Sequence, residues 1–341
     1  MSIRLRAFAL SLICSMLPLL SSLAATLGPA ETISDLRAML EEAASGDILL
    51  IAGEVSMDNG VPLTSEIPVH ITSQSGETAV LRALRLQDAS ITFSNIAFEN
   101  SLLISGTSSI LLSRSVSVRG TDGESGLSFH GNGSLILEPG CKVEGGRGGA
   151  GVSISHSGGE FYTSIEGSVL GGSGASGGPG VLISPLRDSS SVLVSGSIQG
   201  GSGASLGGHA LNLYNLSGNA FVTVSGSLQG GSGSIGGDGI QLVSAGDSVN
   251  VGVSAKVKGG TGDSYGGNAL ILMNAEDSSS FNLSGSFSGG DASGEGAQPG
   301  TSLHLVGESA AVRARIDNCM LEDGRRLAPV AIATQIGRAH V

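Results

Sequence analysis

The sequence has no tryptophan, and aromatic residues make up only 3% of its 341 residues. Surfaces that bind sugar rings by stacking use exposed aromatic side chains, which offer a flat apolar face. The only tyrosines are Tyr162, Tyr214 and Tyr265, and nothing in their spacing suggests a stacked platform. A sugar-binding surface built on aromatic stacking is therefore not expected, whereas one built from polar side chains stays open.

Basic residues are also scarce. Lysine and arginine together number 17 against 29 acidic residues, and no basic run occurs. Three of these arginines, Arg4, Arg6 and Arg338, lie near the chain ends, so residues 26–335 carry 14 basic and 29 acidic side chains, a net charge of −15. Nucleic acids and anionic membrane surfaces bind clustered lysine and arginine. Neither is expected as a partner.

Cysteine is nearly absent. Cys14 lies in the N-terminal apolar stretch, which leaves Cys141 and Cys319, 178 residues apart. If the chain is a stack of coils, about six coils of roughly 4.8 Å each would separate these two by roughly 30 Å, beyond the roughly 7 Å Cα limit of a disulfide. No Cys/His spacing is typical of zinc. We expect no disulfide, no metal and no cofactor.

Both ends of the sequence differ from the rest. Arg4 and Arg6 precede an apolar run and then small residues, which predicts a signal peptide over residues 1–25. Residues 336–341 resemble the translation of a sequencing adapter, so we expect an artefact there and a natural chain that continues beyond Gln335. On this interpretation the last coil presents an unpaired strand edge.

Residues 26–46 are expected to form an N-terminal cap. Thr32-Ile33-Ser34-Asp35 is typical of a capping box, and apolar residues at helical spacing follow it up to Ala43. Gly46-Asp47 is expected to end the helix, and the run from Ile48 to Ala52 predicts the first strand. A helix in this place covers the open end of a stack of strands.

Glycine pairs divide the second half of the chain into repeats. The pairs that begin at Gly145, Gly171, Gly200, Gly230, Gly259 and Gly289 follow one another at intervals of 26, 29, 30, 29 and 30 residues. A period of this length is typical of solenoids, in which one supersecondary unit buries its apolar face only against its neighbours.

Three apolar ladders specify which solenoid this is. The ladders are Ile154, Ile183, Leu213, Leu242, Leu272 and Leu305; Ile165, Val194, Val224, Val253, Leu283 and Ile316; and Val169, Ile198, Leu228, Val257, Phe287 and Met320. The second follows the first by 11 residues and the third follows the second by four in every repeat, while only the glycine segment varies in length. Such constancy predicts an all-β solenoid, whose coils wind around a common axis, over residues 47–335, with glycine-rich coils from about 141 to 324. The glycines are expected to form tight corners at positive φ.

The N-terminal half adds shorter runs of alternating apolar residues, among them Leu84 to Leu86 and Ile91 to Phe98, which are expected as separate strands. The helix-then-strand opening, the stretch from Gly131 to Gly146, and the coils from Ser94 to Asn100 and from Ile316 to Met320 resemble the right-handed parallel β-helix, or pectin-lyase-like, superfamily. The resemblance is greatest to its non-enzymatic surface adhesins and autotransporter passengers. It implies a β-helix that displays or binds.

Catalytic residues are not evident. Polysaccharide lyases and hydrolases of this superfamily need clustered carboxylates, but the outward positions beside the first two ladders carry none. The candidate binding face is the variable glycine loops, with Tyr265, Asp263, His209, Asp238 and Asp291. A weaker candidate cluster consists of Arg313, Arg315 and Asp317.

The expected function is adhesion or binding by a secreted or surface-displayed protein, without catalysis. Expected partners are a host or cell-surface glycan or protein, and a membrane only through a C-terminal anchor or barrel that would follow the present sequence. Two alternatives stay open. One is a polysaccharide lyase or hydrolase whose active coils lie beyond the sequence, and the other is a structural component of a surface layer or matrix.

Overall fold

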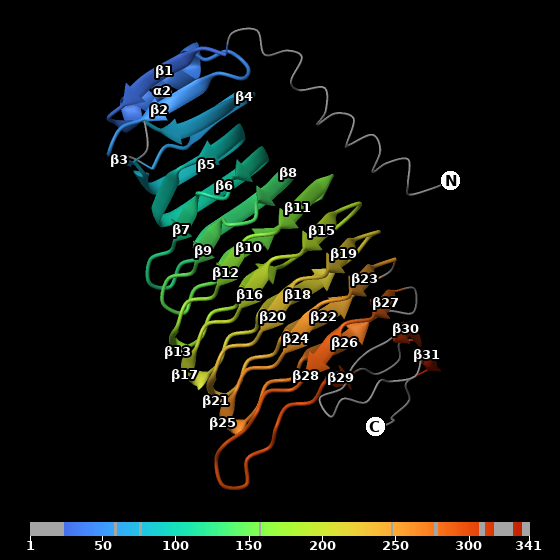
Figure 1. The fold of residues 1–341 in the computed structure, drawn as a ribbon. Helices are drawn as coiled ribbons and strands as arrows, with labels where there is room; N and C mark the ends of the chain where they lie inside the picture. Colours follow the sequence, from blue (N-terminus) through green and yellow to red (C-terminus); the bar gives the residue numbers. More distant parts are fainter. Residues whose placement is uncertain are drawn as a thin grey trace.

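The computed structural model describes residues 24–335 except 58–59, 75–76, 157, 247, 276–278, 307–310 and 317–329. It is a parallel β-solenoid of about 8 turns in which 56% of the residues are in strands (Figure 1). The helix α2 and strand β1 lie at one end of the long axis, and β30 and β31 lie at the other. The predicted all-β parallel β-helix with a short N-terminal helix is confirmed. Residues 1–23 of the predicted signal peptide and the predicted adapter tail lie outside the described residues.

The N-terminal helix forms as its sequence predicts. Helix α2 spans Ile33–Glu42, and Thr32 and Asp35 form the reciprocal hydrogen bonds of a capping box. Leu36 and Leu40 are buried on its inner face. The helix ends four residues earlier than the predicted Gly46, because Ala43 adopts an extended backbone, with φ −65° and ψ 147°.

The predicted cap region also contains a strand that the sequence pattern did not indicate. Strand β1, Thr26–Ala30, precedes the helix in the chain and pairs in parallel with β2, Ile48–Ile51. The stack of strands therefore starts with β1. Gly28 and Pro29 interrupt β1, and the register shifts between Leu27 and Ala30. Glycine and proline weaken a strand, so the segment lacks the usual strand signal and is tolerated only at the edge of the sheet.

The strands fall into three columns that run along the solenoid axis. The first column contains parts of β4 (Leu63–Ser73), β5 (Ala79–Ser94), β6 (Ile96–Leu112) and β8 (Leu127–Leu137), then β10 (Val152–Ser155), β14 (Val181–Ile183), β18 (Leu211–Leu216), β22 (Ile240–Ala245), β26 (Leu270–Ala275) and β29 (Leu303–Val306). The second contains β1, β2, the ends of β4, β5, β6 and β8, then β11 (Phe161–Ile165), β15 (Ser191–Val194), β19 (Phe221–Val224), β23 (Asn250–Val253), β27 (Ser280–Leu283) and β30 (Ala311–Ile316). The third contains β3 (Glu54–Ser56), the beginnings of β5 and β6, then β7 (Ser117–Arg119), β9 (Lys142–Glu144), β12 (Ser168–Leu170), β16 (Ser197–Gln199), β20 (Ser227–Gln229), β24 (Lys256–Lys258) and β28 (Ser286–Ser288).

The predicted ladders are the registers of these columns. Ile154 pairs with Ile183 in the first column. In the same way, Ile165 pairs with Val194 in the second column, and Val169 pairs with Ile198 in the third. Each described member of the three ladders continues this register from one coil to the next, whereas Met320 lies outside the described residues. Stacking like residues in register lets each aliphatic side chain pack on its counterpart, so the ladders form the core.

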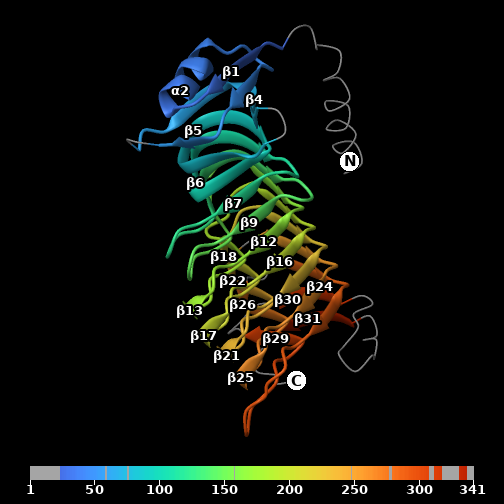
Figure 2. The same cartoon turned by 60° about the vertical axis from the view of Figure 1, so that its left-hand side comes forward.

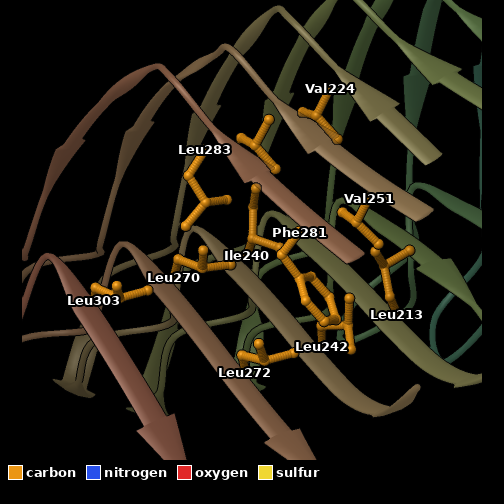
Figure 3. A pocket seen from close by; sticks show the side chains of 11 residues that line it. Leu213, Val224, Ile240, Leu242, Val251, Leu270, Leu272, Phe281, Leu283 and Leu303 are labelled. Carbon is orange, nitrogen blue, oxygen red and sulfur yellow. The ribbon is translucent and has the colours of Figure 1, made fainter. Parts of the chain in front are cut away.

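The core is closely packed where two columns face each other. Aliphatic side chains of β18, β22, β26 and β29 in the first column point toward those of β19, β23 and β27 in the second, and the ring of Phe281 lies among them (Figure 3). The void that they leave holds about 10 Å³ and has no polar lining. A void of this size and lining stays dry and holds no ligand.

The N-terminal strands are longer than predicted. Leu84 to Leu86 and the residues from Ile91 onward belong to one strand, β5, which bends at Asp88 with φ 49°. The predicted run from Ile91 to Phe98 is instead broken at Asn95, with φ 53°. Asparagine and aspartate tolerate the left-handed region better than other side chains, so the chain turns corners at these residues.

The last described pairing is antiparallel. β31, Val330–Gln335, pairs along its whole length with β30. The prediction that the last coil leaves its strand edge unpaired is therefore wrong for β30, because an antiparallel neighbour satisfies the same N–H and C=O groups as another parallel coil.

Candidate functional site

The glycine pairs form a narrow neck on one side of the solenoid. In the four coils whose first pairs begin at Gly171, Gly200, Gly230 and Gly259, this pair leads outward and a second pair returns, and the amide of the returning glycine donates to the carbonyl of the outgoing one. These bonds join Gly178 to Gly172, Gly208 to Gly201, Gly237 to Gly231 and Gly267 to Gly260, each at 2.8 Å. The outgoing glycines in turn donate to the returning glycines of the preceding coil, as Gly201 does to Gly178 at 2.8 Å. The two walls of the neck are therefore joined by backbone alone.

The neck has no room for a side chain. A β-carbon on Gly172 would overlap the carbonyl oxygen of Gly146, and one on Gly208 would overlap that of Gly178. The glycines of these pairs do not have positive φ. The prediction that they form tight corners is wrong, because here the requirement is close approach of two backbones rather than left-handed conformation.

Beyond the neck the coils form a projecting fin. Its four short parallel strands are β13 (Gly174–Ser176), β17 (Gly203–Leu206), β21 (Gly233–Ile235) and β25 (Gly262–Tyr265), and they make a sheet separate from the main one. The two views in Figures 1 and 2 place these strands along one long edge of the solenoid. The fin corresponds to the predicted variable face.

Hydroxyl groups line the start of the fin strands. Ser173, Ser202, Ser232 and Thr261 occupy equivalent positions in successive coils; Ser232 donates to Ser202 at 3.0 Å and the amide of Ser202 donates to Ser173 at 3.2 Å. Beside this row lies a shallow hollow of about 320 Å³ with Gly203, Gly233 and Gly262 in its lining, together with Ala204, Ser232, Thr261, Asp263 and Ser293. Among the described residues that line the hollow, Asp263 is the only charged one. We call this surface the hydroxyl hollow.

The ends of the fin strands carry an apolar row. Leu206 is in register with Ile235, and Ile235 with Tyr265. Their side chains are 47%, 42% and 51% exposed. Tyr265, predicted as a binding residue, thus continues an exposed aliphatic row instead of an aromatic platform. We call these three residues the tip row.

A column of polar side chains follows the returning glycine pairs. His209, Asp238, Asn268 and Thr301 occupy this position in successive coils, and each contacts the next. The amide of Asp238 donates to His209 Nδ1 at 3.0 Å, and the amide of Asn268 donates to Asp238 Oδ1 at 2.8 Å. Asp238 is only 6% exposed. Its carboxylate is occupied by protein donors, which favours a structural role for it.

The structure therefore separates the predicted site residues. His209 and Asp238 lie together, with Nδ1 and Oδ2 3.1 Å apart, while Asp263 lines the hydroxyl hollow and Tyr265 ends the tip row. Asp291 extends the hydroxyl row by one coil and pairs with Lys258 at 3.4 Å.

Two residues of the weaker predicted cluster lie within the described part of the chain. Arg313 and Arg315 lie in β30, in register with Ser280 and Asn282 of β27, and Asp317 lies outside the described residues. No group of three or more His, Cys, Asp or Glu side chains that could hold a metal occurs in the described part of the chain.

Sequence reasoning missed most partners of the candidate residues. Leu206 and Ile235 belong with Tyr265, and Asn268 and Thr301 belong with Asp238. The ladder spacing contained the signal, because residues at equal distances before successive ladder positions fall into one column.

Comparisons with known proteins identify no relative of this chain. No protein-family model matches the chain, and neither a curated protein nor a solved structure matches it. Among the described residues, α2 is much too short to cross a membrane, and no other helix there has the necessary length and apolarity.

Proposed function

We propose that this protein is an exported, surface-displayed β-solenoid that binds a glycan or protein through its fin, without turnover. The observation that carries the proposal is the tip row: three of the five large apolar side chains that are exposed in the described residues fall in this one column. Exposed apolar groups gathered on one surface are typical of binding sites, whereas scattered ones need no explanation.

The neck makes the fin suitable for binding. Backbone hydrogen bonds of 2.7 to 2.8 Å join each described coil of the neck to the next, so the fin residues keep a fixed spacing. A preorganised surface loses less conformational entropy on binding than a flexible loop. The tip row and the hydroxyl hollow then present apolar and polar groups on the same rigid projection.

The chemistry of the hydroxyl hollow favours polar, uncharged ligand groups. Serine and threonine hydroxyls both donate and accept hydrogen bonds, as sugar hydroxyls and peptide groups do. Asp263 adds a negative charge to the hollow, whereas Asp291 beside it is paired with Lys258, so the hollow disfavours polyanionic ligands such as uronate polymers.

Binding by the purified chain to glycan and protein arrays and to cell surfaces tests the proposal. The test variant replaces Leu206, Ile235 and Tyr265 with serine, and the matched control is Phe221→Ser, which alters a side chain that is also 51% exposed but lies in β19. We expect the triple variant to lose binding and Phe221→Ser to retain it, with unchanged circular dichroism for both. Equal binding by the two variants would contradict the role of the fin. Release of unsaturated or reducing ends from a polysaccharide would show turnover and overturn the proposal.

A further inference from the structure

A groove lies at the N-terminal end of the solenoid, far along the chain from the fin. Arg37, Leu40, Glu41 and Ala43 line one side of it, and the segment 62–67 lines the other. Its volume is about 560 Å³, within the roughly 300 to 1,000 Å³ of typical ligand sites. The groove thus separates helix α2 from the beginning of β4.

The strand that borders this groove has an open edge. Leu63 and Ser65 of β4 pair with Leu86 and Ala89 of β5 on one side. On the other side, no strand in the described part of the chain pairs with this segment, because β2 pairs only with the far end of β4, from His70 to Ser73. Helix α2 packs against β4 without strand pairing, and the groove lies between α2 and residues 62–67. An open strand edge presents backbone donors and acceptors to any extended chain that fits beside it.

The side chains around the groove give it a definite chemistry. Leu40 and Leu63 are buried and form an apolar base, while Glu41 and Glu66 are exposed at the two rims. Neither glutamate forms an ion pair within the described residues. Arg37 is held by a hydrogen bond from its guanidinium to the carbonyl of Val61, at 2.6 Å. The two glutamates on opposite rims therefore leave the groove open to cationic side chains.

We propose that this groove binds an extended peptide of a partner protein, which adds to the edge of β4 as a further strand and alternates apolar with basic side chains. Addition of a strand to a sheet edge draws its affinity from main-chain hydrogen bonds and its specificity from alternate side chains. The apolar side chains of the peptide face Leu40 and Leu63, and its lysine or arginine side chains reach Glu41 and Glu66. This site is independent of the fin and of the function proposed for it.

Fluorescence anisotropy with a labelled peptide of alternating valine and lysine tests the proposal on the full chain. We expect saturable binding that is abolished when the peptide is N-methylated along one edge and retained when it is N-methylated along the other, because only one edge pairs with β4. Reversal of both charges, Glu41→Lys with Glu66→Lys, should weaken binding about fivefold, as expected for exposed ion pairs. Glu160→Lys, an equally exposed glutamate elsewhere, should leave binding unchanged.

Three outcomes would overturn the proposal. One is the absence of saturable binding by the peptide. Another is equal binding by the two N-methylated peptides, which would show attraction by surface charge alone. The third is a concentration-dependent dimer of the chain that Glu66→Lys dissociates, because the groove would then belong to a second copy of the solenoid. Sedimentation velocity detects such a dimer.

Discussion

The backbone amide of Gly208 donates to the carbonyl oxygen of Gly201 across the neck of the solenoid, with 2.8 Å between nitrogen and oxygen. The two residues belong to opposite walls of one coil, so the walls meet without any side chain between them. The chain thus has two kinds of interior: an aliphatic core, where stacked side chains fill the space, and a neck, where the backbone itself does so. Glycine is required in the second kind for a steric reason.

Replacement of Gly237 by alanine should destabilise the fold. Its β-carbon would overlap the carbonyl oxygen of Gly208, so the walls must separate and the bond from Gly237 to Gly231 must weaken. We expect the free energy of unfolding to fall by about 1 to 3 kcal/mol, the usual cost of overpacking. Urea denaturation followed by circular dichroism measures the change.

Gly252 provides the matched control for this prediction. It lies in β23, where an added β-carbon meets nothing within 4 Å. Gly252→Ala should therefore leave stability unchanged or raise it by about 0.4 to 1 kcal/mol, because the unfolded chain loses freedom. Equal effects of the two substitutions would show that the neck is looser than its hydrogen bonds indicate.

Replacement of Phe281 by alanine should open a cavity in the core. The ring is 3% exposed and packs against aliphatic side chains of the facing column (Figure 3). We expect a loss of about 3 to 5 kcal/mol in the free energy of unfolding, since rigid walls collapse only partly into the space. Phe221→Ala, at a ring that is 51% exposed, should change it by no more than about 0.5 kcal/mol. A small effect of Phe281→Ala would indicate that the neighbouring coils repack.

The core could be predicted from the sequence because its determinants repeat locally. The constant spacing from Ile154 to Ile165 and from Ile165 to Val169 recurs in each coil and maps directly onto strand register. The neck could not be predicted in the same way. The bond between Gly208 and Gly201 depends on how closely two walls approach, which no single coil specifies.

The candidate site also has a part that the sequence could predict and a part that it could not. Tyr265 and Asp263 were identifiable as loop residues from the repeat pattern alone. Their neighbours Leu206 and Ile235 lie at the same distance before the following ladder residue, so the sequence already placed them in one column with Tyr265. The sequence pattern did not indicate that the glycine segments pair as strands of a separate sheet. Strand β1 was not predicted for a different reason: Gly28 and Pro29 interrupt the pattern of residues that is typical of a strand.

Cys141 should be unreactive in the folded chain. Burial raises the pKa of its thiol to about 12, with a further contribution from the charge of Glu138, so the nucleophilic thiolate is scarce. We expect iodoacetamide at pH 8 to modify Cys141 only after addition of denaturant, and peptide mass spectrometry distinguishes this residue from Cys319.

The raised pKa of Cys141 also affects stability. The free energy of unfolding should fall as the pH rises above the ordinary thiol value of 9.0, because the unfolded chain then loses the thiol proton while the folded chain keeps it. Rapid modification of Cys141 without denaturant would show that the third column opens readily.

His70 should make the fold less stable in mild acid. Burial lowers the pKa of its imidazole from the ordinary value of 6.5, and its Nε2 lies 2.7 Å from the hydroxyl of Ser94. Between the lowered pKa of the folded chain and 6.5, the unfolded chain binds more protons, so stability is full above pH 6.5 and falls as pH decreases below it. The difference in urea midpoint between pH 7.5 and pH 5 should shrink in His70→Gln and persist in His130→Gln, a histidine that is exposed. A pKa above 6.5 for His70 in an NMR titration would contradict this expectation.

Asp238 and Asp263 should respond oppositely to removal of their carboxylates. Asp238 accepts hydrogen bonds from both the amide and the side chain of Asn268, at 2.8 and 3.1 Å, and it is buried. Asp238→Ala leaves these donors without their charged acceptor, so we expect the free energy of unfolding to fall by about 1.5 to 3 kcal/mol. Asp263 is exposed in the hydroxyl hollow, and Asp263→Ala should change stability by no more than about 0.5 kcal/mol. Measured by urea denaturation and by array binding in parallel, Asp238→Ala should lose stability, whereas Asp263→Ala should alter only ligand preference. The reverse result would place the functional carboxylate in the polar column that begins at His209 and not in the hydroxyl hollow.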